Sequence, residues 1–337
     1  MPVHPDRLTG LFAGIIHRMG RKVPYSLDRL EHYWGKSMDE IFPAPTDIPV
    51  LKRRRRWKLG GVFSEDIQFP STYAPLDEVF EEQYEHQYQK CHTVYAKRII
   101  PPGSEGRPRM LYIHGYMQPE TPLEELVLVT GLARAMQMEV IQLQPPHHGR
   151  RKARGSRFDG EYYWSSDIVR SVEAVRQTIW DARHLLNALF AEDDRPFGVT
   201  GISLGGSISA ILTCVEPRLT YSFPLIAHMD LAAVTRDAPV LGRMRRELDE
   251  YGWQLNRFTE LLGSWGWYDL KPLVPREHIH LFAGRADHFF PANKVEAMWE
   301  EWGQPAIKWR SASHMGFIPF LPIVFRQMRT FLDDRCL

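Results

Sequence analysis

The stretch GVTGISLGGSIS, residues 198–209, decides the fold of this chain. It contains the pattern Gly-x-Ser-x-Gly as Gly201-Ile202-Ser203-Leu204-Gly205, and a further glycine follows. The residues before it, Phe197–Thr200, read as a short apolar strand, and Ser207–Val215 read as a helix. In that context the glycines let the serine occupy a tight, strained turn that lifts its hydroxyl from the end of a strand. The stretch therefore predicts Ser203 as a nucleophile.

Strands and helices alternate on both sides of this turn from about residue 91 onward. The expected strands are 93–100, 109–113, 139–143, 197–202, 222–227, 278–283 and 306–310, and the expected helices are 122–138, 166–190, 207–215, 294–302 and 323–332. Such alternation predicts an α/β fold, a mostly parallel sheet with helices on both faces. Reactive loops of such sheets lie at the carboxyl ends of the strands.

Two loops at the ends of later strands supply the groups that a serine nucleophile needs, a base and an acid that orients the base. The loop GRADHFFP contains Asp287, and the loop SASHMG contains His314. The order Ser203, Asp287, His314 along the chain is the one expected of a fold that carries this type of turn. Asp230, after the strand at 222–227, stays open as an alternative acid.

An oxyanion hole would complete the site with two backbone N–H groups. One is expected from Leu204, directly after the serine, and the other from Tyr116 in the loop HGYMQPE. His114 would brace that loop. His147 and His148 follow the strand at 139–143, where they are either ordinary loop histidines or substrate contacts. The candidates for substrate contact are therefore His114, Gly115, His147 and His148.

Residues 90–335 resemble the α/β-hydrolase superfamily through HGY, GISLGG, GRADHFFP and SASHMG, in that order. The chain is also similar to an uncharacterised branch of abhydrolase-domain-containing proteins, which share a Pro-His-Gly segment and TG-x-S-x-GG. The resemblance implies the α/β-hydrolase fold with an eight-stranded, mostly parallel sheet and a catalytic triad, which carries over to Ser203, Asp287 and His314.

The same resemblance implies a helical lid between strands six and seven, which corresponds to residues 230–275. Residues 1–90 are then an N-terminal extension packed on the body, and residues 91–337 form the hydrolase domain. Candidates for lining an acyl or aromatic pocket under the lid are Met244, Tyr251, Trp253, Phe258, Trp265 and Trp267. Packing of the lid onto the body explains these side chains equally well.

The composition is typical of a soluble globular protein, with 44% apolar and 25% charged residues among 337. A net charge of +1 argues against nucleic acid as a partner. Three widely spaced cysteines fit a reducing compartment, and without a run of about 18 apolar residues we expect no transmembrane segment and a cytoplasmic location. The run KRRRRWK, residues 52–58, is either a patch for phosphate or lipid headgroups, which would allow peripheral membrane contact, or a solvated arm.

These patterns predict a serine hydrolase that cleaves a carboxylic ester, or a related acyl bond, in a small-molecule or lipid-like substrate. We expect no metal or cofactor, because the one His-x-His, His278–His280, has no acidic partner at a metal-site spacing and no phosphate-binding glycine loop is present. Two alternatives keep the fold: an acyltransferase, and a catalytically silent binding protein. The oligomeric state and the acyl-chain preference stay open.

Overall fold

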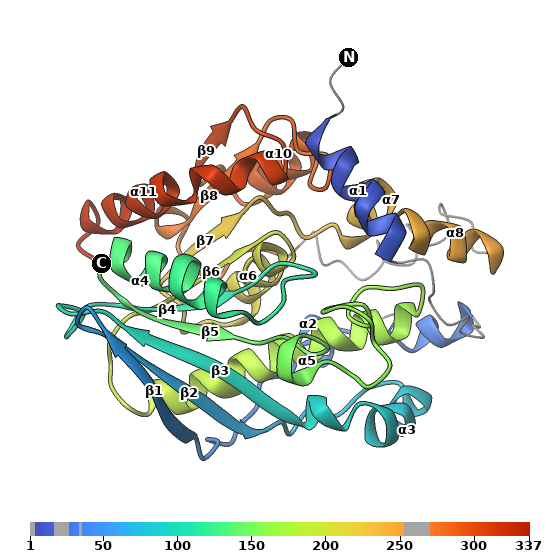
Figure 1. The fold of residues 1–337 in the computed structure, drawn as a ribbon, viewed down its shortest axis with the longest axis horizontal. Helices are drawn as coiled ribbons and strands as arrows, with labels where there is room; N and C mark the ends of the chain where they lie inside the picture. The colour runs from blue at the N-terminus through green and yellow to red at the C-terminus, as the bar shows by residue number, and fades with distance from the viewer. Residues whose placement is uncertain (1–3, 17–26, 34–35, 253–269) are drawn as a thin grey trace.

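A computed structural model describes residues 4–16, 27–33, 36–252 and 270–337 (Figure 1). Its strands are β1 (Lys52–Leu59), β2 (Val62–Pro70), β3 (Thr93–Ile100), β4 (Arg109–Ile113), β5 (Glu139–Leu143), β6 (Phe197–Ile202), β7 (Tyr221–Leu225), β8 (His280–Gly284) and β9 (Ala306–Arg310). They form one nine-stranded sheet in the order β1-β2-β3-β5-β4-β6-β7-β8-β9. The six strands from β5 to β9 run parallel, and β1, β2 and β3 are antiparallel to their neighbours. The predicted mostly parallel sheet is confirmed.

The sheet has one strand more than the eight expected, and it begins before residue 91, where the regular alternation starts. β1 and β2 form an antiparallel hairpin joined through Gly60 and Gly61, both at positive φ, and β2 pairs along its length with β3. Residues 52–70 are therefore part of the sheet itself.

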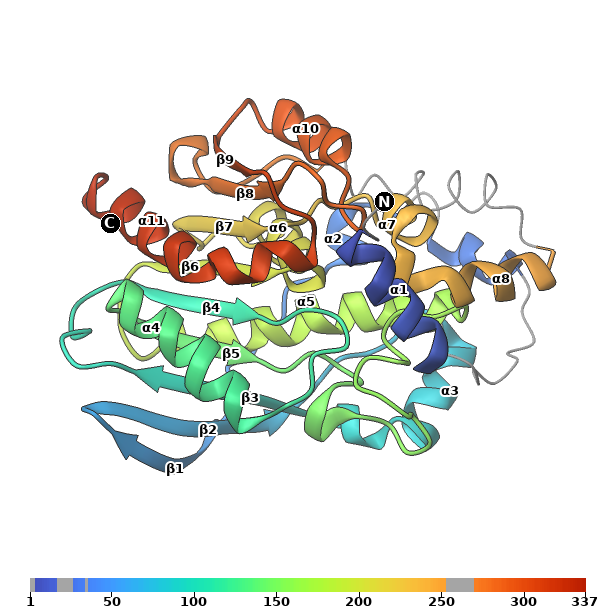
Figure 2. The same ribbon diagram turned by 45° about the horizontal axis from the view of Figure 1, so that its top comes forward.

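Helices cover both faces of the sheet, as expected (Figure 2). The α-helices are α1 (Pro5–Ile16), α2 (Met38–Ile41), α3 (Glu78–Gln87), α4 (Thr130–Met136), α5 (Ile168–Phe190), α6 (Leu204–Val215), α7 (Leu231–Asp237), α8 (Gly242–Glu250), α10 (Ala292–Glu301) and α11 (Leu321–Asp333). A π-helical segment, η3 (Glu124–Val129), precedes α4. The 3-10 helices are η1 (Leu27–Tyr33), η2 (Gln89–His92), η4 (Gly149–Arg151), η5 (Pro239–Leu241), η7 (Arg276–His278) and η8 (Met315–Phe320).

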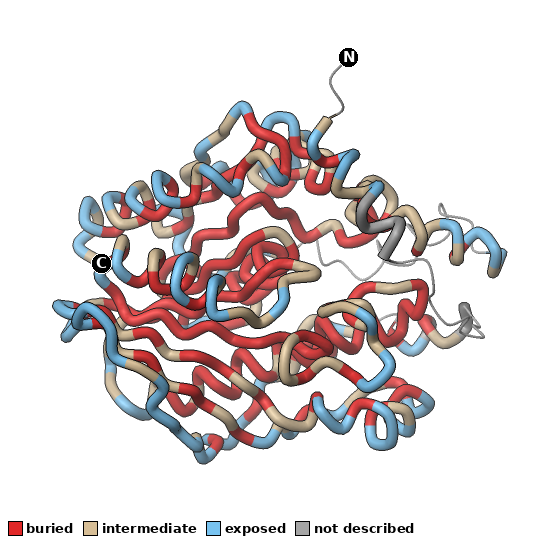
Figure 3. The backbone as a smooth tube through the Cα atoms, viewed as in Figure 1, coloured by how far each residue is buried: buried red, intermediate tan, exposed pale blue. Residues whose placement is uncertain are grey.

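Alternation along the central strands divides the core into two layers. In β4, Leu111 and Ile113 pack with residues of α5 and α6, whereas Met110 and Tyr112 pack with residues of α4 and α11. All five residues of β4 are buried, which is typical of a parallel strand covered on both faces (Figure 3). The reactive loops therefore stand on a rigid, doubly covered sheet.

The long helix α5 joins the core to the segment before β3 through buried polar groups. Glu173 is ion-paired with Arg176 at 2.6 Å, and both side chains are almost fully buried. Glu173 also accepts hydrogen bonds from the hydroxyls of Tyr33 and Tyr73, and Arg176 donates to the Ile41 carbonyl at 2.8 Å. Residues 33, 41 and 73 are thus bound to α5 by buried groups.

The arginine run KRRRRWK lies in β1, the edge strand of the sheet, where seven of eight residues are exposed. Arg53 pairs with Glu65 at 3.0 Å, and Arg54 and Arg56 pair with Asp66 at 3.2 and 3.3 Å. The guanidinium of Arg55 lies over the Phe63 ring, 5.1 Å from its centroid. Much of this positive charge is therefore balanced by the neighbouring strand.

Of the predicted lid, residues 230–275, the structure describes 230–252 and 270–275. α7, η5 and α8 follow β7, and Met244 is buried in the core. Tyr251, at the end of α8, is partly buried against the same core. The remaining candidate aromatics, Trp253, Phe258, Trp265 and Trp267, lie outside the described residues. Among the helices that are described, none is long and apolar enough to cross a membrane.

Candidate active site

Ser203 lies between the end of β6 and the start of α6 with φ 60° and ψ −120°, a strained conformation for a residue with a side chain. The glycines beside it allow close approach of the backbone. A Cβ atom at Gly205 would lie 2.0 Å from the Ile113 carbonyl oxygen, and one at Gly201 would lie 2.2 Å from the Gly205 oxygen. The glycines of the motif thus let the turn around Ser203 pack directly against the end of β4.

Two hydrogen bonds connect three predicted site residues, Ser203, His314 and Asp287, with His314 in the middle. His314 Nε2 is 2.9 Å from Ser203 Oγ, and His314 Nδ1 is 2.8 Å from Asp287 Oδ2. The other carboxylate oxygen of Asp287 accepts the backbone N–H groups of Phe289 and Phe290 at 2.7 and 2.8 Å. Asp287 and His314 are 4% and 5% exposed, so the chain of hydrogen bonds is shielded from water except at the serine.

The alternative acid, Asp230, is engaged elsewhere. It caps the N-terminus of α7 by accepting the Ala233 N–H at 2.8 Å, and it pairs with Lys294 at 2.7 Å. Burial alone would raise the pKa of Asp230, but Lys294 and the Ala233 N–H hold it below the ordinary value. In this geometry His314 is oriented by Asp287.

The loop after β4 lies next to the serine. A Cβ atom at Gly115 would lie 3.3 Å from the Ile202 carbonyl oxygen and 3.6 Å from Ser203 Cβ. The Gly115 N–H is bound by Gln118 Oε1 at 3.1 Å, which fixes the loop. Tyr116 lines the cavity at Ser203, and Leu204 lines it as the first residue of α6, where an N–H has no acceptor within its own helix.

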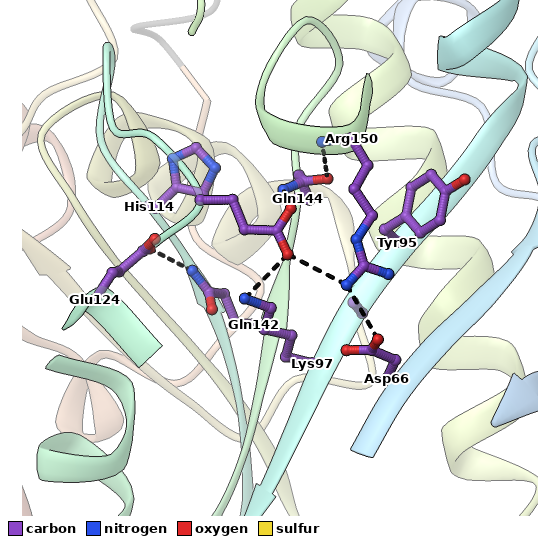
Figure 4. A pocket seen from close by; sticks show the side chains of 10 residues that line it. Asp66, Tyr95, Lys97, His114, Glu124, Gln142, Gln144 and Arg150 are labelled. Atoms are coloured by element: carbon purple, nitrogen blue, oxygen red, sulfur yellow. Dashed lines mark hydrogen bonds and ion pairs between the residues drawn. The ribbon is translucent and has the colours of Figure 1, made fainter. Parts of the chain in front are cut away.

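Glu120, and Glu124 at the start of η3, line a small polar pocket together with side chains from β2, β3 and β5 (Figure 4). Glu120 pairs with Lys97 at 3.1 Å and with Arg150 at 3.4 Å, and Arg150 continues to Asp66. Burial raises the pKa of Glu124 to about 7, although hydrogen bonding to the Gln142 amide acts in the opposite direction. These pairs hold the loop that carries Tyr116.

The three candidate histidines lie behind the site. His114 bonds through Nδ1 to the Gly115 carbonyl at 2.9 Å and packs edge-on against His148, 4.8 Å between centroids. His147 and His148 are 2% and 0% exposed, and neither lines the cavity at Ser203. Burial lowers the pKa of His114 to about 4 and holds the pKa values of His147 and His148 well below the ordinary value of histidine. They support the loops as neutral rings, and of the four contact candidates Gly115 alone lines the cavity.

A cavity of about 340 Å³ opens at Ser203 and has largely apolar walls. Its lining includes Trp164, Leu231, Val234, Ala238, Val240, Leu241, Phe289 and Phe290, with Thr9 contributed by α1. The indole N–H of Trp164 donates to Thr235 Oγ1 at 3.0 Å, so the polar atom of this ring is already bonded. A largely apolar cavity of this size is typical of a small-molecule binding site.

Sequence reasoning missed Asp6 and Gln118. Gln118 lies three residues after Gly115 in the loop HGYMQPE, so the hydrogen bond between them is a local contact that the sequence could have suggested. Asp6 bonds to backbone N–H groups of residues 288, 314 and 315, and the sequence carries no signal for such contacts.

Among the described residues, His4, Asp6 and His288 are close enough to share a metal ion. Both carboxylate oxygens of Asp6 already accept backbone N–H groups, so this trio does not suit a metal. All three cysteines, Cys91, Cys214 and Cys336, are free.

Comparison with known proteins agrees with this fold. Two uncharacterised proteins of Mycobacterium tuberculosis, from strains CDC 1551 and H37Rv, are each 28% identical to the chain over 308 residues, which covers 86% of this chain and 69% of theirs. Among solved structures, acetyl xylan esterase 1 from Thermoanaerobacterium sp. JW/SL YS485 is similar with a TM-score of 0.59 at 14% identity, covering 94% of this chain and 98% of that one. A cold-adapted esterase from an Arctic intertidal metagenomic library gives a TM-score of 0.53 at 15% identity, covering 85% and 99%.

At these identities the structural likeness concerns the fold alone. A family model described as "Alpha/beta hydrolase domain containing 18" matches residues 52–238, which is more than half of the chain and includes Ser203. This range also includes β1 and β2, so these two strands belong to the family's sequence pattern. The chain belongs to the alpha/beta hydrolase domain containing 18 family, within the α/β hydrolases.

Proposed function

We propose that this protein is a serine hydrolase that cleaves carboxylic esters through an acyl-enzyme. The observation that carries the proposal is the continuous hydrogen-bonded chain from Ser203 Oγ through His314 to Asp287, at 2.9 and 2.8 Å. Hydrogen-bond reach from nucleophile to base, and from base to an orienting carboxylate, is the geometry that activates a serine.

In the proposed mechanism His314 Nε2 takes the proton of Ser203 as the serine oxygen attacks the ester carbonyl. The resulting oxyanion is held by the backbone N–H groups of Leu204 and Tyr116. Asp287 keeps His314 in the tautomer with its proton on Nδ1, and the imidazolium then protonates the leaving alcohol. Water, activated by the same histidine, hydrolyses the acyl-enzyme.

The cavity suggests the kind of acyl group. Its walls are formed mostly by aliphatic and aromatic side chains. Among the lining residues that the structure describes, none carries a carboxylate, an amine or a guanidinium, and His314 carries the one imidazole. Burying an apolar chain there contributes about 25 cal/mol for each Å² removed from water, whereas a charged acyl group would lose its hydration without a partner. We therefore propose an uncharged ester with an apolar acyl or aryl group.

A fluorophosphonate probe tests the nucleophile. We expect the wild-type protein to be labelled and to hydrolyse p-nitrophenyl esters, and Ser203→Ala to lose the label and on the order of 10⁴-fold or more in kcat/KM. The matched control is Ser209→Ala in the same stretch, because that hydroxyl donates to the Gly206 carbonyl within α6 and faces the core. Equal labelling of wild type and Ser203→Ala, or of neither, would falsify the proposal. Partitioning of product toward an added alcohol would identify acyl transfer.

A further inference from the structure

The side chain of Asp6 is fully buried and bonds to both loops that carry the proposed acid and base. Its Oδ2 accepts the backbone N–H groups of His288 and His314, each at 3.0 Å. Its Oδ1 accepts the Met315 N–H at 3.1 Å. One carboxylate near the start of the chain thus connects two loops that lie about 280 and 310 residues further along.

These bonds lie where the pairing of the two loops ends. Beyond β8 and β9, the Arg285 N–H still donates to the Arg310 carbonyl at 2.8 Å, and the Ala286 N–H donates to the Ala312 carbonyl at 3.0 Å. The N–H groups of His288 and His314 then both bond to Asp6 Oδ2. A side chain with two acceptor oxygens can satisfy these three N–H donors. An ionised carboxylate suits them best, because it carries no proton and acts only as an acceptor.

Further contacts hold α1 and the residues before it next to the site. The His4 ring stacks on the His288 ring, with 3.9 Å between centroids and 12° between planes. α1 packs against η5 and lies beside α7 in both views (Figures 1 and 2). Gly10 fits tightly there, because a Cβ atom at this position would lie 2.7 Å from Pro239 Cβ. Thr9, one turn from Asp6, lines the cavity at Ser203.

We propose that Asp6 is a positioning residue of the active site, whose carboxylate fixes the Asp287 and His314 loops relative to each other so that His314 reaches Ser203. This inference rests on the proposed function. Small displacements matter in such a chain, because an error of about 1 Å in the placement of reacting groups costs on the order of 10²-fold in rate.

Asp6 also adds negative charge beside His314. The titratable groups around that imidazole, besides Ser203, are Asp287, Asp6, His288 and His4. The Phe290 ring stacks on His314, and His228 packs edge-on against the same ring, 5.1 Å between centroids. The charges of Asp230 and Lys294, which pair with each other, act on His228. Burial alone would raise the pKa of Asp6, but the N–H groups of His288, Met315 and His314 hold it below the ordinary value. Asp6 is therefore ionised at neutral pH, and it favours the imidazolium that forms when His314 takes the serine proton.

The test compares Asp6→Ala and Asp6→Asn with two controls, using p-nitrophenyl ester kinetics, fluorophosphonate labelling and thermal melting. Arg7→Ala changes an exposed neighbour on α1, and Asp77→Asn changes another buried aspartate that caps a helix, α3, away from the site. We expect both Asp6 variants to lower kcat by about 10-fold to 10²-fold with a smaller change in KM. In Asp6→Asn the acid limb of the kcat/KM profile moves to lower pH, because removing a negative charge disfavours the imidazolium.

Hydrogen exchange of the folded protein supplies a readout that needs no activity. Peptides covering 287–290 and 313–317 lose protection in Asp6→Asn, while peptides of α4 keep it. The proposal would be overturned if Asp6→Asn kept the wild-type kcat and the wild-type acid limb. It would also be overturned if Asp77→Asn showed the same loss of kcat and the same shift of the acid limb as Asp6→Asn. If the wild type is inactive toward esters, the proposed function fails separately, and unchanged exchange in Asp6→Asn still overturns the role of Asp6. If neither Asp6 variant folds, Asp6 is a general determinant of folding and the proposal is wrong.

Discussion

Asp287 and Asp230 both follow parallel strands of the sheet, yet their surroundings give them different roles. Asp287 has one oxygen on His314 and the other on two backbone N–H groups, so its charge and orientation are directed at the imidazole. Asp230 is bound by Lys294 and by the first turn of α7. The sequence left both aspartates open as the acid, because each follows a strand and the choice depends on which side chain His314 meets.

We predict that Asp287→Asn lowers kcat/KM by about 10³-fold to 10⁴-fold, because the amide would favour the wrong tautomer of His314. Asp230→Ala, by contrast, keeps ester hydrolysis within about threefold of wild type and costs roughly 1 kcal/mol of stability through the lost helix cap. Steady-state kinetics and urea denaturation of both variants check this. The opposite ranking of the two activities would make Asp230 the acid.

At the scale of elements, the turn from β6 to α6 depends on the absence of side chains between α6 and β4. Gly205 is the first-turn residue whose missing Cβ lets the helix start over the ends of Ile113 and His114, where their carbonyl oxygens would be 2.0 and 2.6 Å away. Gly131, in α4, has open space where its Cβ would stand. Both glycines lie in helices. Replacing each by alanine therefore distinguishes the effect of a steric clash, which arises at Gly205, from the effect of helix propensity, which is the same at both positions.

We predict that Gly205→Ala lowers the free energy of unfolding by about 3 kcal/mol or more and abolishes fluorophosphonate labelling, because backbone atoms of β4 cannot move aside. Gly131→Ala raises stability by up to about 1 kcal/mol through higher helix propensity and leaves labelling unchanged. Chemical denaturation and gel-based labelling measure both effects. A stable, labelled Gly205→Ala protein would contradict this account of the elbow.

The fold and part of the site could be predicted from the sequence because their signals are local. Strand, turn and helix around Ser203 are consecutive, and Asp287 and His314 each follow a short apolar strand. β1 was harder to recognise, because it is an exposed run of basic residues rather than an alternating pattern. The contacts of Asp6 could not be predicted from the sequence, because its partners are backbone N–H groups that only the complete fold brings close to it.

For the whole molecule, the buried polar contacts of α5 determine how the segment before β3 responds to denaturation. Glu173 and Arg176 bind residues 33, 41 and 73 in places where the unpaired groups could not be hydrated. An uncompensated buried charge is strongly unfavourable. The segment should therefore unfold together with the hydrolase body.

We predict one cooperative unfolding transition, with tryptophan fluorescence and circular dichroism giving the same midpoint. Arg176→Met lowers the free energy of unfolding by about 3–5 kcal/mol, because it leaves Glu173 buried without its partner. The control is Lys271→Met, which breaks a pair with Glu301 in which both side chains are more than half exposed, and costs about 0–1 kcal/mol. Two separate transitions would show that the segment before β3 folds on its own.

The arginine strand has a further consequence for how copies of this protein meet. β1 forms an edge of the sheet, where backbone N–H and C=O groups are available to pair with another strand. Six of its eight residues are lysine or arginine, and ion pairs with β2 involve three of them, Arg53, Arg54 and Arg56. A second copy approaching edge to edge would therefore bring the remaining like charges, Lys52, Arg55 and Lys58, close to their equivalents. Salt screens that repulsion. Resistance of this edge of the sheet to the addition of another strand is therefore greatest at low ionic strength.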